Sequence, residues 1–308
     1  MGMAGRVAFL TMDDLGVYVS DDELARAPLR ALGWEVELVP WRAAVVDWSR
    51  FAGVVIRSTW DYHDHLAEFL LALERIEAQG APLANPLTLV RANVRKTYLI
   101  DLADRGYPIP RTEVVDALDA SALDAFLRDA GPGGAVVKPA VGASGWEAFH
   151  VRRDDRAGAE RALGALGGRE ALLQPFLPAI LSEGERSLVY FSGAFSHALD
   201  KVPVRGEFRV QEEHGGIITG VEADPRSLEV ADAIVARLAP TPLYARVDLV
   251  RDGDRPLLME LELVEPSLYL RTGAGAPERF AAAVDAWLRS AAPGRPLSPI
   301  GAPLSSRP

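Results

Sequence analysis

The stretch that decides the fold is LLMELELVEP, residues 257 to 266. It alternates apolar and polar residues as a half-buried β-strand does, yet carboxylates stand at Glu260, Glu262 and Glu265. Glu260 and Glu262 are two residues apart, so their side chains point to the same face of the strand. Two like charges that close repel each other, and acidic residues are depleted in strands. The pattern therefore indicates that a cation lies over this face.

A neighbouring strand supplies a third carboxylate. ARVDLV, residues 245 to 250, precedes a turn around Asp252 and Gly253, so the two strands are expected to form a hairpin with Asp248 opposite residues 258 to 260. Carboxylates without His or Cys suit Mg²⁺, which is usually shared between one or two carboxylates and phosphate oxygens. The alternative is a solvated sheet face, which is the better interpretation for any one of these acids alone.

Composition sets the outer limits. The chain has 308 residues, of which 49% are hydrophobic and 25% charged, as in a soluble globular protein of two or three packed units. A net charge of −10 argues against nucleic acid or an anionic membrane as the partner. The absence of cysteine excludes disulfides, thiolate zinc sites, iron–sulfur clusters and cysteine nucleophiles. No apolar run is long enough to span a membrane and no secretory signal pattern begins the chain, so we expect the cytoplasm.

The first third of the chain alternates strands and helices, which predicts an α/β fold with a parallel layer. Its expected strands are RVAFLT, WEVELVP and FAGVVIRS, at residues 6–11, 34–40 and 51–58. Ser20 is a candidate N-cap for a following helix, which Pro28 weakens, and NVRKTYLIDLADRG predicts a helix over residues 93–106. From residue 185 onward the pattern is largely β, interrupted by a helix that Asp224 should cap.

Mg²⁺ held by a few carboxylates usually also binds substrate phosphates, and a phosphate site needs positively charged side chains nearby. Lys138 stands at the end of a strand expected to be buried, in AVVKPAVGASGW, where an unpaired lysine is costly. The small residues Gly142 to Gly145 follow, and their N–H groups could close over phosphates. The spacing fits neither the Walker A motif nor GxGxxG. Taken alone, the loop is equally well explained as a plain hairpin turn.

A candidate substrate site follows the third strand. Ligands of open α/β sheets lie beyond the carboxyl ends of the strands, where RSTWDY places Arg57, Trp60, Asp61 and Tyr62. Arg57 could bind a substrate carboxylate through two hydrogen bonds, with the other three side chains lining the remainder. The alternative is that Asp61 or Asp64 caps the next helix while Trp60 packs, and for Asp64 we favour the cap.

Several stretches in a specific order carry a resemblance to a known family. They are VVIRSTWDY (54–62), NPLTLVRANVRKTYL (85–99), VVKPAVGASG (136–145), LLQPFLPAILSEGERSLVYFSG (172–193), HALDKVP (197–203), FRVQEEHGG (208–216), ARVDLV (245–250) and MELELVEPSLYL (259–270). Over residues 6 to 290 the chain resembles the ATP-grasp superfamily, in particular its bacterial glutathione synthetase-like branch and the D-cycloserine-forming cyclo-ligases. The resemblance implies an N-terminal α/β substrate domain (1–90), a central lid subdomain (91–171), a C-terminal metal subdomain (172–290) and a flexible Pro-rich tail (291–308).

The resemblance also implies roles for individual residues. Lys96 and Lys138 look like the two ATP lysines, and the loop with Gly142, Ser144 and Gly145 looks like the flap over the phosphates. Gln174, Phe176 and Leu177 look like the hinge whose backbone groups hold the adenine edge, with the acidic Glu185 near the nucleotide. Lys201 is expected to face the γ-phosphate, and Arg209 to steady an acyl phosphate or the reacting carboxylate. Asp248, Glu260 and Glu262 match the magnesium ligands, for two ions.

Two positions depart from the glutathione synthetase pattern. The run Glu185, Arg186, Ser187 shifts or removes one basic contact, and Glu262 stands where Asn is usual. Both departures put glutathione chemistry itself in doubt.

The implied reaction is ATP-dependent ligation. ATP phosphorylates a carboxylate, an amine attacks the acyl phosphate, and ADP and phosphate leave. An intramolecular cyclo-ligase is one alternative, and a nucleotide-binding module without turnover or a small-molecule kinase are others. The expected partners are a small-molecule carboxylate and an amine of undisclosed identity, and a homodimer is left open.

Overall fold

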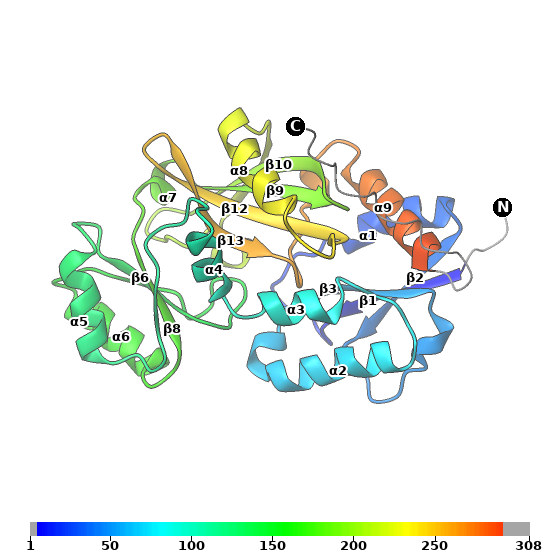
Figure 1. Ribbon diagram of the computed structural model, residues 1–308, viewed down its shortest axis with the longest axis horizontal. Coiled ribbons are helices and arrows are strands. Elements are labelled where there is room, and N and C mark those ends of the chain that lie inside the picture. Colours follow the sequence, from blue (N-terminus) through cyan, green and yellow to red (C-terminus); the bar gives the residue numbers. More distant parts are fainter. Residues whose placement is uncertain (1–4, 292–308) are drawn as a thin grey trace, which may run out of the picture.

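The structure is a computed structural model, described here for residues 5 to 291 (Figure 1). Three sheets organise it: a small sheet with two helices at one end, a five-stranded antiparallel sheet, and an N-terminal parallel sheet (Figure 1). The predicted α/β class is confirmed. The Pro-rich tail lies outside the described residues. No helix in the described range has the length and apolar character needed to cross a membrane.

The N-terminal sheet is parallel, in the order β2-β1-β3-β4. Its strands are β1 (Gly5–Thr11), β2 (Trp34–Pro40), β3 (Gly53–Ser58) and β4 (Leu83–Ala84). Both faces of β1 are buried, as expected for a parallel sheet covered on both sides. Val7 and Phe9 join one core cluster, whereas Ala8 and Leu10 join another.

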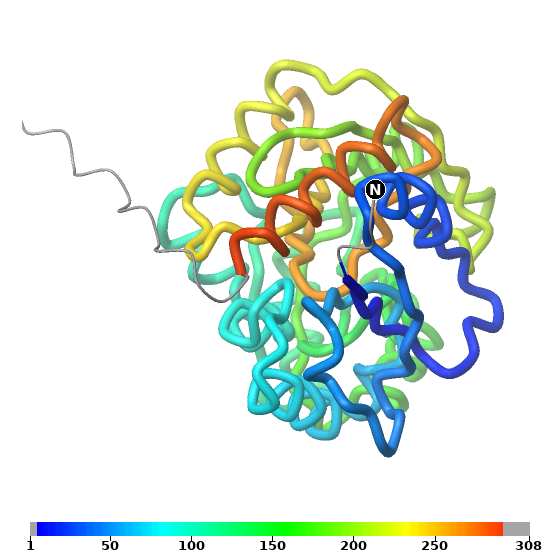
Figure 2. Tube along the Cα trace, turned by 90° about the vertical axis from the view of Figure 1, so that its right-hand side faces the viewer, coloured from blue at the N-terminus to red at the C-terminus, as the bar shows by residue number. Residues whose placement is uncertain are grey.

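Three helices supply the cover. α1 (Asp22–Ala31) and α9 (Ala276–Ala291) cover one face, and α2 (Leu66–Ala78) covers the other. Figure 2 shows α9, in red, lying beside the blue N-terminal region, although the two segments are far apart in sequence. The last described helix, α9, thus packs against the N-terminal sheet, a contact that no local pattern predicts.

The C-terminal sheet is antiparallel, in the order β11-β10-β9-β12-β13. Its strands are β9 (Glu185–Phe191), β10 (Ala194–Val202), β11 (Ile217–Val221), β12 (Tyr244–Asp252) and β13 (Arg255–Glu262). α8 (Pro225–Val235) packs its apolar side against one face. The Asp224 side chain accepts a hydrogen bond from the Ser227 N–H at 3.0 Å, which confirms the predicted N-cap.

The central sheet has the order β5-β8-β6-β7 and is also antiparallel. Its strands are β5 (Glu113–Val115), β6 (Ala135–Pro139), β7 (Phe149–Val151) and β8 (Ala171–Pro175), and its helices are α5 (Ala120–Asp129) and α6 (Arg156–Leu166). The boundary predicted at residue 171 falls at the start of β8. Because β8 pairs with β6, the central unit extends to Pro175.

Some local expectations need correction. The helix predicted over residues 93–106 is shorter, since α3 (Leu87–Asn93) ends there and α4 (Tyr98–Asp104) begins after Lys96. Pro28 lies inside α1 without ending it. Asp64 does not cap α2, whose N-cap is His65 without a side-chain bond. The Asp64 carboxylate instead lies 3.2 Å from Nδ1 of the His63 ring.

Candidate active site

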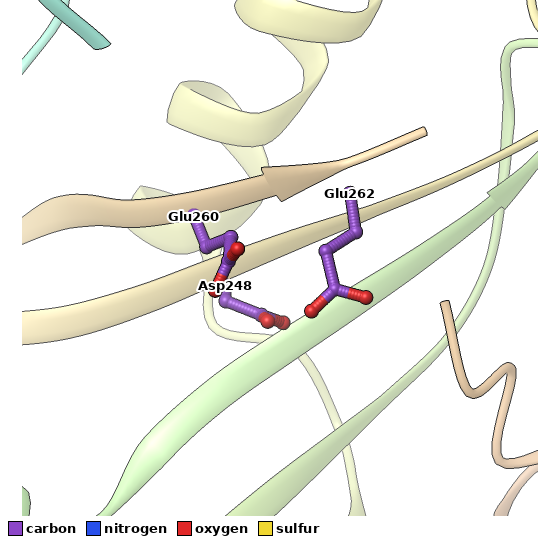
Figure 3. A group of neighbouring side chains, drawn as sticks. All are labelled: Asp248, Glu260 and Glu262. Atoms are coloured by element: carbon purple, nitrogen blue, oxygen red, sulfur yellow. The ribbon is translucent and has the colours of Figure 1, made fainter. Parts of the chain in front are cut away.

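The β12–β13 hairpin brings the predicted carboxylates together. Its antiparallel register pairs Asp248 with Glu260 and Arg246 with Glu262. Asp248, Glu260 and Glu262 each offer an oxygen, and these oxygens all lie within 4.8 Å of one another (Figure 3). The predicted convergence of three carboxylates on one sheet face is therefore confirmed. That they bind metal stays a prediction.

Two cations hold Asp248, which is almost fully buried. Arg246 Nη2 lies 2.9 Å from its carboxylate and also pairs with Glu262. Lys201 Nζ lies 3.2 Å from Asp248 and 2.5 Å from Glu185. Burial alone would raise the pKa of Asp248, but Arg246 and Lys201 hold it well below its usual value. Asp248 is therefore an anion at every physiological pH.

The two glutamates differ in their protonation. Lys96 Nζ lies 2.6 Å from Glu260, and with Lys138 it keeps the Glu260 pKa low despite burial. Burial raises the pKa of Glu262 to about 7, and repulsion from Glu260 adds to this while Arg246 opposes it. Glu262 is therefore the carboxylate of the cluster that takes up a proton most readily. A bound cation would favour its ionised form.

A single cavity runs along this cluster and between the three sheets. Most predicted site residues line it, namely Trp60, Tyr62, Lys96, Lys138, Gly142, Ser144, Gly145, Phe176, Leu177, Glu185, Arg209, Glu260 and Glu262. Asp248 and Lys201 lie directly beneath it, buried. Because these residues come from all three units, the cavity exists only where the units meet.

Besides Asp248 and Lys201, three predicted residues do not line the cavity. Arg57 is buried, and its Nε donates to Asp22 at 2.8 Å, so its partner is internal. Asp61 accepts a hydrogen bond from the Trp41 indole at 2.7 Å. Gln174 is fully buried and donates to the Thr112 hydroxyl at 2.8 Å. The Arg57 and Asp61 side chains thus have partners inside the protein, whereas the adenine contact predicted at Gln174 concerns its backbone. All three roles stay predictions.

Lys138 is the lysine without a partner. It lines the cavity, is half-buried, and forms no ion pair or side-chain hydrogen bond with residues 5–291. Burial lowers its pKa from 10.5 to about 8, although Glu260 opposes the shift. A cation in such a position is stabilised by an anionic ligand. The sequence prediction that Lys138 requires an anion therefore has a structural basis.

The loop of residues 142 to 148, which contains the flap predicted at Gly142 to Gly145, lines one side of the cavity. Its Ser144 carbonyl lies 3.0 Å from the His214 ring, and the Trp146 indole donates to the Tyr18 hydroxyl at 2.8 Å. Gly145 has φ +65°, and a Cβ there would lie 2.7 Å from the Gln211 side-chain oxygen. Glycine is needed at this position both for the backbone and for the close approach.

Sequence reasoning missed several functional side chains. Arg246 was detectable, because it precedes Asp248 by two residues and so shares its face. Asn93 was not, since it bridges the backbone of Leu261 and Leu263 across the molecule at 2.8 Å each. Tyr18 follows the first strand in a loop that carries no motif.

Sequence comparison identifies both parts of this architecture. The ATP-grasp domain of prokaryotic glutathione synthetase matches residues 103–267, more than half of the chain, and the N-terminal domain of D-cycloserine synthetase DcsG matches residues 7–85. The chain belongs to the ATP-grasp family. Within it, the cycloserine biosynthesis protein DcsG of Streptomyces lavendulae is 36% identical over 268 residues, 83% of this chain and 89% of the relative. The glutathione synthetase of Salmonella typhimurium is 30% identical over 211 residues, 65% of this chain and 62% of that one.

Solved ATP-grasp structures agree with the fold. The crystal structure of D-cycloserine synthetase DcsG has a TM-score of 0.82 at 33% identity, covering 92% of this chain and all of the other. The D-alanine–D-alanine ligase of Bacillus anthracis has a TM-score of 0.63 at 15% identity, covering 94% of this chain and 96% of that one, which shows the fold alone. The expected family and its ATP-grasp fold are confirmed. This ATP-grasp protein is an ATP-dependent ligase that forms C–N bonds between small-molecule carboxylates and amines.

Proposed function

We propose that this ligase phosphorylates a carboxylate of an amino-acid-like substrate and joins the acyl group to an amine, releasing ADP and phosphate. One observation carries the proposal at this site: the unpartnered Lys138 shares a cavity with the cluster of Asp248, Glu260 and Glu262. A half-buried cation without an anionic partner among the described residues, beside a cluster of carboxylate oxygens, fits a phosphate bound with a divalent metal.

The cavity has a polar, positively charged part suited to the phosphates of a nucleotide and an apolar part suited to its base. Lys138, Lys96 and the flap supply positive charge and backbone N–H groups for phosphates. The apolar side chains of Phe176, Leu177 and neighbouring Ile180 supply a surface for the adenine ring. The Gln174 side chain donates to Thr112, so we assign the adenine contacts of this hinge to backbone groups.

The donor set fits magnesium. Asp248, Glu260 and Glu262 present only carboxylate oxygens, the ligands that Mg²⁺ prefers. Arg246 and Lys201 keep Asp248 ionised and fixed in place, so Lys201 is a positioning residue in our proposal and not a direct phosphate contact. Bound Mg²⁺ would neutralise charge on the phosphate oxygens, and two ions are the proposed number.

Arg209 is proposed to steady the acyl phosphate. It lines the cavity, where Glu207 holds one end of its guanidinium at 2.6 Å. Its Nε is buried and has no hydrogen-bond partner in the described part of the chain. A donor left in this state is available to an oxygen of the substrate. The chain thus supplies positioning and positive charge at the point where phosphoryl transfer needs them.

Ring closure within one substrate is the second candidate. It is supported by the similarity to a protein named for cycloserine biosynthesis, which extends over both the N-terminal domain and the ATP-grasp domain. In this version the amine and the activated carboxylate belong to one molecule. A homodimer and a cytoplasmic location stay predictions.

The reaction class is tested by incubating the protein with Mg²⁺-ATP and a panel of amino acids, with and without hydroxylamine. We expect ADP release that depends on the amino acid, and a hydroxamate when hydroxylamine intercepts the acyl phosphate. ADP without hydroxamate would favour a hydroxyl kinase. No ADP with any amino acid would favour a binding module without turnover.

A further inference from the structure

Glu265 is a buried carboxylate that the proposed reaction does not use. Its side chain lines the cavity, and the residue is only 8% exposed. Within residues 5–291 its carboxylate forms no ion pair and accepts no hydrogen bond. An anion this buried is unfavourable unless a cation joins it.

The other charged side chains of the cavity are mostly neutralised within the protein. The paired ones are Lys96 with Glu260, Glu185 with Lys201, Arg209 with Glu207, Glu212 with Arg271, and Arg246 with Glu262. Lys138, Glu265 and the half-buried Glu213 are the lining residues of the described chain that lack such a partner. Among the described residues, the cavity therefore presents one unpaired cation for an anionic ligand and, in Glu265, a deeply buried carboxyl group that a cationic ligand would favour in its ionised form.

Aromatic residues line the same cavity as Glu265, among them Tyr18, Trp60 and Tyr62. The Trp60 indole donates to the Glu265 backbone carbonyl at 2.9 Å, and the Tyr18 ring lies 5.2 Å from the Trp60 ring. Burial, and after it the Glu265 charge, raises the pKa of Tyr62, which places the carboxylate near this ring. A cavity lined by both a carboxylate and aromatic side chains is suited to an organic ammonium, because both attract a cation.

The raised pKa of Glu265 is what a buried carboxyl group without a paired cation should have. Burial raises the pKa of Glu265 from 4.5 to about 8, and the Glu262 charge adds to the shift. Magnesium is a poorer match, since Glu265 is not among the carboxylates that share the 4.8 Å cluster.

We infer that Glu265, with Trp60 and Tyr18, binds the cationic amino group of the substrate and so selects amino acids over plain carboxylic acids. The inference rests on the proposed function. No bond is made or broken at Glu265. The residue determines specificity by supplying the charge that an ammonium requires and that a hydroxyl does not.

The first test compares 2-amino acids with the matching 2-hydroxy acids in the ADP-release assay. We expect Glu265→Gln to lower the preference for the amino acid, as a ratio of kcat/KM values, by about tenfold or more. The KM for ATP and the Mg²⁺ requirement should not change. Glu265→Asp should keep part of the preference. Glu222→Gln removes an exposed charge that does not line the cavity, and it should leave the ratio unchanged.

The second test needs no substrate. Methylammonium chloride should raise the Tm of the wild-type protein above that in equimolar sodium chloride, and Glu265→Gln should abolish the difference. An unchanged preference together with an equal methylammonium effect in both proteins would overturn the inference, as would an altered Mg²⁺ requirement. If the wild-type protein releases ADP with neither acid class, the proposed function fails, and the methylammonium comparison still decides this inference.

Discussion

Lys138→Met separates a ligand-binding role for Lys138 from a structural one. The unpartnered lysine should destabilise the protein when no nucleotide is bound, because burial lowers its pKa from 10.5 to about 8. At about 1.4 kcal/mol per pKa unit, the difference corresponds to about 3 kcal/mol at pH 7. Since the side chain is only half-buried, solvent screening reduces this, and we expect Lys138→Met to stabilise the nucleotide-free protein by about 1–3 kcal/mol.

The pH dependence gives the prediction its sign. A lysine whose folded pKa is depressed destabilises the folded state below that pKa, and the penalty fades as pH rises toward the unfolded value. The advantage of Lys138→Met should therefore be full below pH 8 and vanish by pH 10.5. Urea denaturation across this range measures it.

Nucleotide titration completes the experiment. Lys138→Met should lose most of its ATP affinity while gaining stability. Lys96→Met is the matched control, because it leaves Glu260 without its partner at 2.6 Å and should destabilise the protein. A Lys138→Met protein that is less stable than wild type at pH 7, or that binds ATP normally, would refute the reasoning.

Three further predictions concern other parts of the site. Glu260→Gln should abolish Mg²⁺-dependent turnover and cost about 1 kcal/mol of stability, since Lys96 exchanges a charged acceptor for a neutral one; near-normal turnover would contradict the metal assignment. Leu261→Asn, on the opposite and buried face, should cost about 3 kcal/mol in urea denaturation but leave the Mg²⁺ dependence of ATP hydrolysis unchanged. Arg57→Ala should cost about 3–5 kcal/mol, because it leaves Asp22 buried and unpaired. If Arg57 also contacts substrate, Arg57→Ala should raise the substrate KM more than the ATP KM. If the variant loses stability while both KM values stay unchanged, Arg57 serves only to pair with Asp22.

The hairpin and its carboxylates were predictable because their signals are local. Period-two spacing fixes the shared face of Glu260 and Glu262, and the turn at Gly253 sets the register as far as Leu249, which pairs with Leu258. A register shift between Leu249 and Asp248 then brings Asp248 opposite Glu260 instead of Met259, and no local signal predicts that shift. Glu265 stood in the same stretch, but only the fold shows that it is buried without a partner.

The cations that neutralise these acids were harder to assign. Lys201 reaches Asp248 from β10, and Lys96 reaches Glu260 from the segment before α4. The sequence indicates only the repulsion between Glu260 and Glu262, which by itself predicts that Glu260 destabilises the metal-free protein. The Lys96 pair reverses that expectation.

The Arg57 prediction shows the same limit. Its place at the end of β3 is as expected, yet its partner Asp22 comes from α1, and the Pro266 carbonyl accepts a second hydrogen bond at 3.2 Å. A pattern read along one strand identifies a charged side chain near a sheet edge. It does not reveal an internal partner that arrives from another element.

The most direct test of the central claim is an anomalous difference map from crystals grown with Mn²⁺ and a non-hydrolysable ATP analogue. Mn²⁺ takes the oxygen ligands that suit Mg²⁺ and scatters anomalously. We predict metal density beside the carboxylates of Asp248, Glu260 and Glu262, with the phosphates against Lys138. Nucleotide bound with its metal away from these carboxylates, or with its phosphates away from Lys138, would contradict the account.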